Sequence, residues 1–309
     1  MSSLKIAFIF PGQGSQKIGM GKEFYDNSKR AKELLDNASE QCSIDFANLL
    51  FKEDNRLSQS EFTQPAIVLN SLMAYLYFSD YIQIKPLYAL GHSLGEFSAV
   101  AIQGGFDYID ALSLVRKRGK FMQEDCANAR AGMMVVLGLD DEKIENICKD
   151  AKTNNKQIYA ANYNTKDQVV IAGLKDDLLS YEIKFKEAGA KRTIFLDMSV
   201  ASHCPLLNNA SIKLENELKN ILKNNFNSVI SNVNTKPYSD KTKALELLKA
   251  QLISPVLYKQ SIQNIQDEID MFVEFGSNVL KNLNKKITLK PTFSIITPND
   301  MDEFMKVYK

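Results

Sequence analysis

Short apolar runs alternate with longer amphipathic segments along most of the chain. Runs at 5–10, 87–90, 228–232 and 271–275 have the length and apolar character of buried strands. Between them, apolar residues recur every three or four positions, which predicts helices at 23–43, 63–78, 96–103, after Asp107, at 243–252 and at 255–266. We expect the second helix to begin at Thr63, with Pro65 in its first turn. Strands that alternate with helices predict an α/β protein with a mostly parallel sheet.

The order of elements changes between residues 133 and 197. Strands are predicted at 133–137, 157–162, 168–172 and 192–197, with helices at 141–152 and 176–188. This β-α-β-β-α-β order is typical of a ferredoxin-like unit. We therefore predict a small inserted domain at 128–198 and a discontinuous large domain formed by 1–127 and 199–309. A single sheet that runs through both parts is the alternative.

Composition excludes several classes of protein. The 309 residues are 45% hydrophobic with a formal net charge of +1, so no overall field draws the chain to nucleic acid. The four cysteines lack C-x-x-C spacing, which argues against a zinc site and a disulfide framework and fits a reducing compartment. The apolar run Ile6 to Phe10 is too short for a signal peptide, and Asn70 interrupts the longest apolar stretch. We expect a cytoplasmic protein without a membrane span.

A glycine-flanked serine follows the apolar run at 87–90. The residues Gly91-His92-Ser93-Leu94-Gly95 match the G-x-S-x-G pattern of a nucleophile elbow, and good helix formers come directly after them. A turn this tight needs glycine on either side, because a side chain there collides with the neighbouring strand or helix. The turn would hold the Ser93 hydroxyl at a helix start, where free N–H groups favour a developing negative charge. An ordinary turn is the alternative.

A second glycine-rich loop, Pro11 to Gln16, follows the first predicted strand. A dinucleotide-binding fingerprint would need glycine at the position of Lys17, so the loop gives little support for one. Glycine still allows the backbone N–H groups of such a loop to approach a ligand closely. A plain tight turn is the alternative interpretation.

A serine nucleophile requires a base, and the chain has only two histidines. The side chain of His92, within the elbow, should project to the other side of the turn, which leaves His203 as the candidate base. A buried structural histidine is the alternative. In α/β-hydrolases the histidine lies near the chain end, whereas more than a hundred residues follow His203. A patatin-type dyad would need an Asp-Gly step, which the sequence lacks, so an ordinary esterase is disfavoured.

Five motifs together resemble those of the malonyl-CoA:acyl carrier protein transacylases. They are the glycine loop at 12–16, the elbow at 91–96, and the segments 118–123, 202–204 and 251–256. Their order and spacing follow that family from Phe10 to about Leu280. The resemblance implies an α/β-hydrolase-like large domain with a ferredoxin-like insert, which agrees with the elements predicted above.

The resemblance also implies roles for individual residues. Ser93 would carry the malonyl ester, and His203 would be its general base. A backbone carbonyl near Gln251, instead of an aspartate, would orient the imidazole. The backbone N–H groups of Gln13 and Leu94 would form the oxyanion hole.

Arg118 would bind the free carboxylate of the malonyl group, according to the same resemblance. A planar guanidinium holds a carboxylate through two parallel hydrogen bonds, and acetyl would leave it buried and unpaired. We expect its neighbours Arg116 and Lys117 on the solvent-exposed face of the same helix. Asn162 matches a polar position of the pocket.

The implied activity is that of an S-malonyltransferase of fatty acid biosynthesis. Malonyl-CoA would acylate the serine, and the phosphopantetheine thiol of acyl carrier protein would then take the malonyl group. We expect no metal, no bound cofactor and a monomer. A serine thioesterase or esterase acting on acyl-CoA is the alternative, and a non-catalytic module that binds the carrier protein is a third.

Two stretches depart from the family pattern. The late Gly-Pro-Gly motif reads Gly276-Ser277-Asn278 here, which affects the conformation of one loop. The residues Val200 to His203 match neither common form of a stretch that varies with the acyl group in related polyketide acyltransferase domains. Malonyl is therefore inferred from the overall resemblance and not from this stretch.

Overall fold

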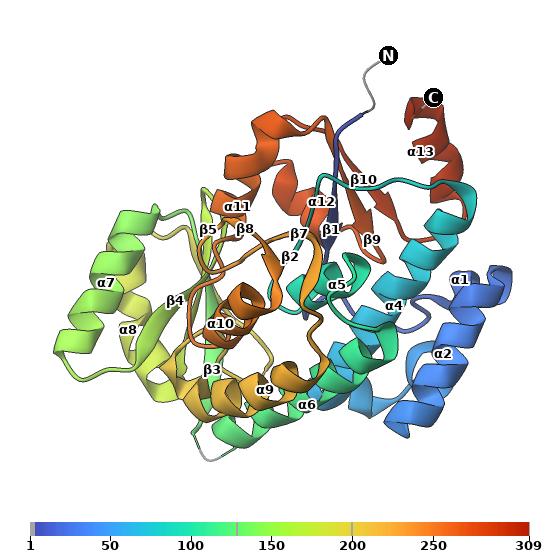
Figure 1. The fold of residues 1–309 in the computed structure, drawn as a ribbon. Coiled ribbons are helices and arrows are strands. Elements are labelled where there is room, and N and C mark those ends of the chain that lie inside the picture. Colours follow the sequence, from blue (N-terminus) through green and yellow to red (C-terminus); the bar gives the residue numbers. More distant parts are fainter. Residues whose placement is uncertain (1–3, 128, 199, 309) are drawn as a thin grey trace.

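The computed structural model describes residues 4–127, 129–198 and 200–308 (Figure 1). Within these ranges the strands form a larger and a smaller sheet, and helices pack against both. The strands are β1 (Ile6–Phe10), β2 (Tyr88–Gly91), β3 (Ala131–Leu137), β4 (Ile158–Thr165), β5 (Gln168–Leu174), β6 (Arg192–Phe195), β7 (Asn225–Ile230), β8 (Pro237–Asp240), β9 (Met271–Phe275) and β10 (Thr292–Ile295).

The helices lie mostly between successive strands, as in α/β proteins generally. Short 3₁₀ turns occupy 55–58, 205–207 and 266–268. The α-helices are α1 (Lys22–Asn27), α2 (Lys29–Cys42), α3 (Phe46–Phe51), α4 (Ser60–Tyr81), α5 (Gly95–Ile102), α6 (Tyr108–Cys126), α7 (Asp141–Thr153), α8 (Lys175–Glu187), α9 (Asn208–Ile221), α10 (Lys241–Gln251), α11 (Tyr258–Ile265), α12 (Val279–Asn284) and α13 (Asp300–Tyr308).

The larger sheet has the strand order β10-β9-β1-β2-β7-β8. Its pairings are parallel except that between β7 and β8. Because successive side chains of a strand point to opposite faces, Phe8 and Phe10 pack into the layer that contains α4 and α5, whereas Ala7 and Ile9 pack toward α11 and α12. The larger sheet therefore lies between two helical layers.

The smaller sheet is antiparallel, with the strand order β4-β5-β3-β6. The helices α7 and α8 cover its outer face (Figure 1). Along β3, Met134 and Val136 pack beneath those helices, whereas Met133 and Val135 face a cavity on the other side. This is the predicted ferredoxin-like arrangement, and the predicted fold class is confirmed. The alternative of a single continuous sheet is wrong.

The proposed division of the chain into domains remains a prediction. Residues 128 and 199, at which the predicted insert begins and the larger domain resumes, lie outside the described residues. The described segment between them contains all four strands of the smaller sheet. The division 1–127, 128–198 and 199–309 is therefore compatible with the two sheets.

The single helix predicted at 23–43 is wrong, since the chain forms α1 and α2 instead. Ser28 separates them with an extended backbone, at φ −130° and ψ 121°. Its hydroxyl accepts a hydrogen bond from the backbone N–H of Ala31, so that it caps the start of α2. The apolar periodicity continues through this break and does not reveal it.

The predicted start of the long apolar helix is also wrong. The helix α4 begins at Ser60, so Thr63 is not its N-cap and Pro65 lies in the second turn. The Thr63 hydroxyl lies 2.6 Å from the carbonyl oxygen of Leu57 and 2.9 Å from that of Gln59, so it acts as a donor and does not accept from a helix N–H. The prediction that this stretch is a buried helix is confirmed.

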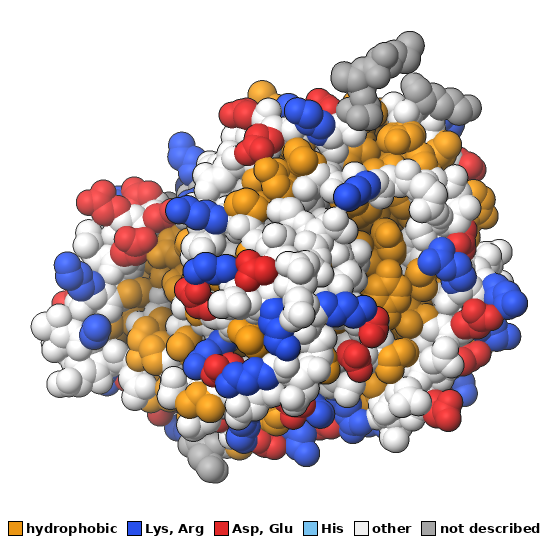
Figure 2. Space-filling model, in the orientation of Figure 1, with side chains coloured by type: hydrophobic (Ala, Val, Ile, Leu, Met, Phe, Trp, Pro, Cys, Tyr) orange, Lys and Arg blue, Asp and Glu red, His pale blue; other side chains and the backbone are white. Residues whose placement is uncertain are grey.

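The face of the molecule drawn in Figure 2 carries interspersed basic and acidic side chains, with neither sign dominating. This agrees with the formal net charge of +1. Among the helices within residues 4–127, 129–198 and 200–308, none combines the length and the apolar character that crossing a bilayer requires.

The two strands β8 and β10 were not predicted from the sequence, because they are short and only partly buried.

Candidate active site

Ser93 lies in the turn that joins β2 to α5, in the left-handed region at φ 52°. The flanking glycines leave no room for a side chain. A Cβ at Gly91 would lie 1.9 Å from the carbonyl carbon of Gly95, and one at Gly95 would lie 2.0 Å from the carbonyl oxygen of Phe10. Both approaches are far closer than any real Cβ contact, so the turn is an elbow that requires both glycines.

Asn232 ties the elbow to the neighbouring strand. It follows β7, which is the parallel neighbour of β2, so both strands end at the same edge of the sheet. Its Oδ1 accepts from the backbone N–H of Ser93 at 2.7 Å, and its Nδ2 donates to the carbonyl of Gly91 at 2.7 Å. The Asn232 amide therefore fixes the strained backbone on both sides of the turn.

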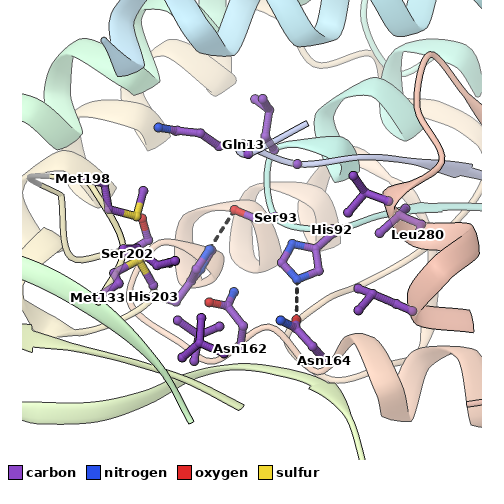
Figure 3. Close-up of a pocket in the computed structure, with 18 of the residues that line it drawn as sticks. Gln13, His92, Ser93, Met133, Asn162, Asn164, Met198, Ser202, His203 and Leu280 are labelled. Atoms are coloured by element: carbon purple, nitrogen blue, oxygen red, sulfur yellow. Dashed lines mark hydrogen bonds between the residues drawn. The ribbon is translucent and has the colours of Figure 1, made fainter. Parts of the chain in front are cut away.

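His203 reaches Ser93 from the loop that follows β6 (Figure 3). Its Nδ1 lies 2.7 Å from the backbone carbonyl of Gln251, which only accepts, so Nδ1 carries the proton. Its Nε2 is then the acceptor for the Ser93 hydroxyl, at 2.7 Å. Burial and the positive charge of Arg118 lower the pKa of His203 to about 3, so the imidazole is neutral before reaction.

His92 makes a different hydrogen bond, although its ring lines the same pocket. Its Nε2 lies 2.7 Å from Oδ1 of Asn164 (Figure 3). The centres of the His92 and Tyr258 rings lie 5.5 Å apart. An amide oxygen only accepts, so this bond occupies the Nε2 proton of His92. The base predicted by elimination, His203, is the histidine that contacts the serine.

Arg118 is buried on α6, with 1% of its surface exposed. Its Nη2 lies 3.2 Å from the Ser93 hydroxyl oxygen and 3.2 Å from Oε1 of Gln251, and its Nη1 donates to Oε1 of Gln64 at 2.8 Å. Its guanidinium also lies 5.1 Å from the ring of Phe97. These partners are neutral. Burial lowers the pKa of Arg118 to about 9, and the nearby negative charge of Glu96 opposes that shift.

The neighbours of Arg118 point elsewhere. Arg116 pairs with Glu61 at 3.1 Å, and Lys117 pairs with Glu217 at 2.8 Å. Both side chains are partly exposed, as expected for the outer face of α6. Only the third of these three basic residues therefore faces the serine.

A cavity of about 290 Å³ opens in front of Ser93. Gln13, which follows β1, and Leu94, which follows the serine, both line it. Within the described residues, the backbone N–H of neither residue donates to a protein acceptor. Both residues of the predicted oxyanion hole therefore line the cavity with a backbone N–H that the described part of the protein leaves free.

The remaining cavity wall is largely apolar. Asn162, on β4, projects into the cavity beside His203 (Figure 3), where an irregularity interrupts its strand pairing. Ser202 lines the same wall. The apolar part consists of Met122, Met133, Val135, Val170, Leu196, Met198, Val279, Leu280 and Leu283. Asn162 thus lies in the pocket, as the sequence indicated.

The family comparison agrees with this geometry. Residues 7–290 match the model of the acyl transferase domain. The malonyl CoA-acyl carrier protein transacylase of Bacillus subtilis is 35% identical over 310 residues, which covers 99% of this chain and 98% of that protein. The chain belongs to this transacylase family.

Solved structures of the transacylase family share the fold. The malonyl-CoA:acyl carrier protein transacylase of Helicobacter pylori is 45% identical and superposes with a TM-score of 0.95 over 99% of each chain. A type II PKS acyl-carrier protein has been solved in complex with its malonyl-transacylase, to which this chain is 30% identical with a TM-score of 0.94 over 98% of this chain. The family resemblance read from five motifs is confirmed.

Several side chains of the site were not anticipated. Asn232 follows β7, Gln64 lies on α4 and Asn164 lies on β4, and no local sequence pattern marks any of them. Glu96 is the last residue of the elbow motif at 91–96, and it is fully buried beside Gln251. An acidic residue within an otherwise apolar helix, directly after a nucleophile elbow, is the signal that points to it.

Proposed function

We propose that the chain transfers the malonyl group of malonyl-CoA to the phosphopantetheine thiol of acyl carrier protein, through an ester on Ser93. One observation carries the proposal. The Ser93 hydroxyl contacts both a neutral histidine and a buried arginine that has no carboxylate partner within the described residues. The charge of Glu96 acts on this guanidinium only across the Gln251 amide, so the buried guanidinium makes no direct ion pair until an anion arrives. The malonyl carboxylate supplies that anion next to the thioester carbonyl.

In the first half-reaction, Ser93 attacks the thioester carbonyl while its hydroxyl proton moves to Nε2 of His203. The backbone N–H groups of Gln13 and Leu94 donate to the oxyanion that forms. The C–S bond then breaks, and the imidazolium returns the proton to the departing CoA thiolate. The products are the Ser93 ester and free CoA.

The second half-reaction runs the same steps in the opposite direction. The carrier thiol gives its proton to His203 and attacks the ester carbonyl, and the C–O bond to Ser93 breaks. The serine oxygen recovers the proton from the imidazolium. The apolar wall, which includes Met133 and Met198, limits the entry of water while the ester waits for the thiol.

A mass measurement tests this function. We expect malonyl-CoA to add one malonyl group to the protein, on the peptide that contains Ser93, and holo acyl carrier protein to remove it. Malonylated carrier protein should accumulate in step with CoA release. Rapid CoA release without carrier and without malonylated carrier would support the thioesterase alternative instead.

Arg118→Ala is expected to weaken malonyl use far more than acetyl use. Two charge-assisted hydrogen bonds contribute ~2–3 kcal/mol, which corresponds to about a 30- to 150-fold fall in the ratio of kcat/KM for malonyl-CoA over acetyl-CoA. Lys117→Ala is the matched control, since its exposed pair with Glu217 should leave that ratio unchanged. Equal losses for both acyl groups after Arg118→Ala would contradict the carboxylate role.

Three further properties belong to the same proposal. The substrate brings its own carrier group, so we propose that the enzyme needs no resident cofactor. We also propose a cytoplasmic location, where acyl carrier protein and CoA esters are available, and a monomeric state. Size-exclusion chromatography with light scattering measures the last of these.

A further inference from the structure

Glu96 is a buried acidic residue that the reaction above does not use. It lies on the first turn of α5 with no exposed surface. Its Oε2 accepts from Nε2 of Gln251 at 2.6 Å and from the backbone N–H of Asn232 at 3.1 Å, and its Oε1 accepts from the hydroxyl of Tyr238 at 2.9 Å. Burial raises the pKa of Glu96 to about 7, and the hydrogen bonds from these three donors oppose that shift. Whether or not the carboxyl group carries a proton, Oε2 is an acceptor, because it receives the backbone N–H of Asn232.

This carboxylate determines which way the Gln251 amide points. The amide end nearest Glu96 must be the NH₂ group, because Oε2 acts as an acceptor toward Asn232 and has no proton to donate to Gln251. The second hydrogen of that group goes to the backbone carbonyl of Ser93 at 3.0 Å. The amide oxygen is therefore left to face Nη2 of Arg118 at 3.2 Å.

The opposite orientation of the amide would be unfavourable at each of its three contacts. It would place N–H groups against the Arg118 guanidinium and an amide oxygen against the Glu96 carboxylate and the Ser93 carbonyl. The side chains of Glu96 and Gln251 are fully buried, so water cannot pair with the polar groups that this orientation would leave without partners. Only one orientation therefore agrees with the surrounding donors and acceptors.

We propose that Glu96 is a positioning residue, which fixes the direction of the Gln251 side-chain amide and thereby the place of Arg118 beside Ser93. The inference rests on the proposed function, in which Arg118 receives the malonyl carboxylate. It concerns the side chain of Gln251 alone, because the imidazole of His203 is held by the backbone carbonyl of that residue. Substitution of the Gln251 side chain therefore leaves the base oriented.

A double-mutant cycle tests whether Glu96 acts through Gln251. We expect Glu96→Leu and Gln251→Leu each to lower the kcat/KM ratio of malonyl-CoA over acetyl-CoA about tenfold, mainly through the KM for malonyl-CoA. The double variant should be no worse than Gln251→Leu alone. Multiplicative effects, or an unchanged ratio in Gln251→Leu, would overturn the proposal.

A conservative variant separates the direction of the amide from the charge. In Glu96→Gln, the side-chain oxygen can accept from Gln251 and Asn232, and the NH₂ group can donate to the Tyr238 oxygen. We therefore expect Glu96→Gln to keep the malonyl preference within about threefold of the wild type. A loss as large as that of Glu96→Leu would overturn the proposal. Tyr238→Phe is the matched control, because it removes only the donor on the far oxygen.

Poor folding of a variant does not change the measured quantity, which is the kcat/KM ratio of malonyl-CoA over acetyl-CoA. A ratio of two substrates measured on one sample does not depend on the fraction of folded enzyme. If Glu96→Leu yields no folded protein, Gln251→Leu and Glu96→Gln still decide, the first by losing the ratio and the second by keeping it. A wild-type enzyme that never forms the Ser93 ester would instead refute the proposed function, so the two failures are distinguishable.

Discussion

Ser93→Ala is expected to take up no malonyl group from malonyl-CoA and to transfer none to acyl carrier protein. Without the hydroxyl no ester can form. The remaining hydrogen-bond donors of the site can then assist only the slow attack of water on malonyl-CoA. We expect the transfer rate to fall by a factor on the order of 10⁴ or more. Intact mass after incubation with malonyl-CoA measures the ester, and gel separation of carrier protein measures transfer.

Ser98→Ala provides the matched control on the same helix. The Ser98 hydroxyl is buried on α5 and lacks a hydrogen-bond partner in the part of the chain that the structure describes. Its removal should leave both ester formation and transfer at the wild-type level. Retention of malonyl transfer in Ser93→Ala would show that another residue carries the acyl group.

His203→Ala is expected to slow both half-reactions by about 10²–10⁴-fold, the range for loss of a general base. The serine then has to lose its proton to water, in a cavity whose wall is mostly apolar. Stopped-flow measurement of CoA release follows the first half-reaction. Transfer from enzyme that has been acylated slowly beforehand follows the second, so the proton role is measured in each direction.

The other histidine supplies the comparison. His92→Gln removes an imidazole that bonds Asn164 and does not contact the serine. We expect a loss well below that of His203→Ala, arising from the changed pocket wall. A larger loss from His92→Gln than from His203→Ala would reverse the assignment of the base.

Local patterns were sufficient for much of the fold. The apolar run before Gly91 and the helix formers after Gly95 predicted the elbow, because both the strand period and the glycine requirement are properties of neighbouring residues. The β-α-β-β-α-β order predicted the smaller sheet for the same reason. The break at Ser28 was not predictable from periodicity, since two helices in line bury the same face as one.

The contacts that support the site could be identified only from the tertiary structure. Gln251 reaches Ser93 across 158 positions of sequence and Asn232 reaches it across 139. Asn232 meets Ser93 because the parallel strands β2 and β7 end at one edge of the sheet, whereas Gln251 comes from the last residue of α10. Both placements depend on the whole fold. Ser93, His203 and Arg118 were predictable because nucleophile, base and carboxylate partner each require a particular residue type. A residue that only orients another side chain can be of several polar types, so its type does not reveal it in the sequence.

The alternation along β3 has a consequence for how this enzyme can diversify. Met133 and Val135 belong to the wall of the acyl cavity, while the serine, its base and the arginine come from elements outside the smaller sheet. Substitutions on the cavity side of β3 can reshape the space for the acyl chain without moving a reacting atom. The reaction and the shape of the acyl space are therefore separable traits, on which natural variation or laboratory selection can act one at a time, whereas the carboxylate preference stays with Arg118 beside the serine.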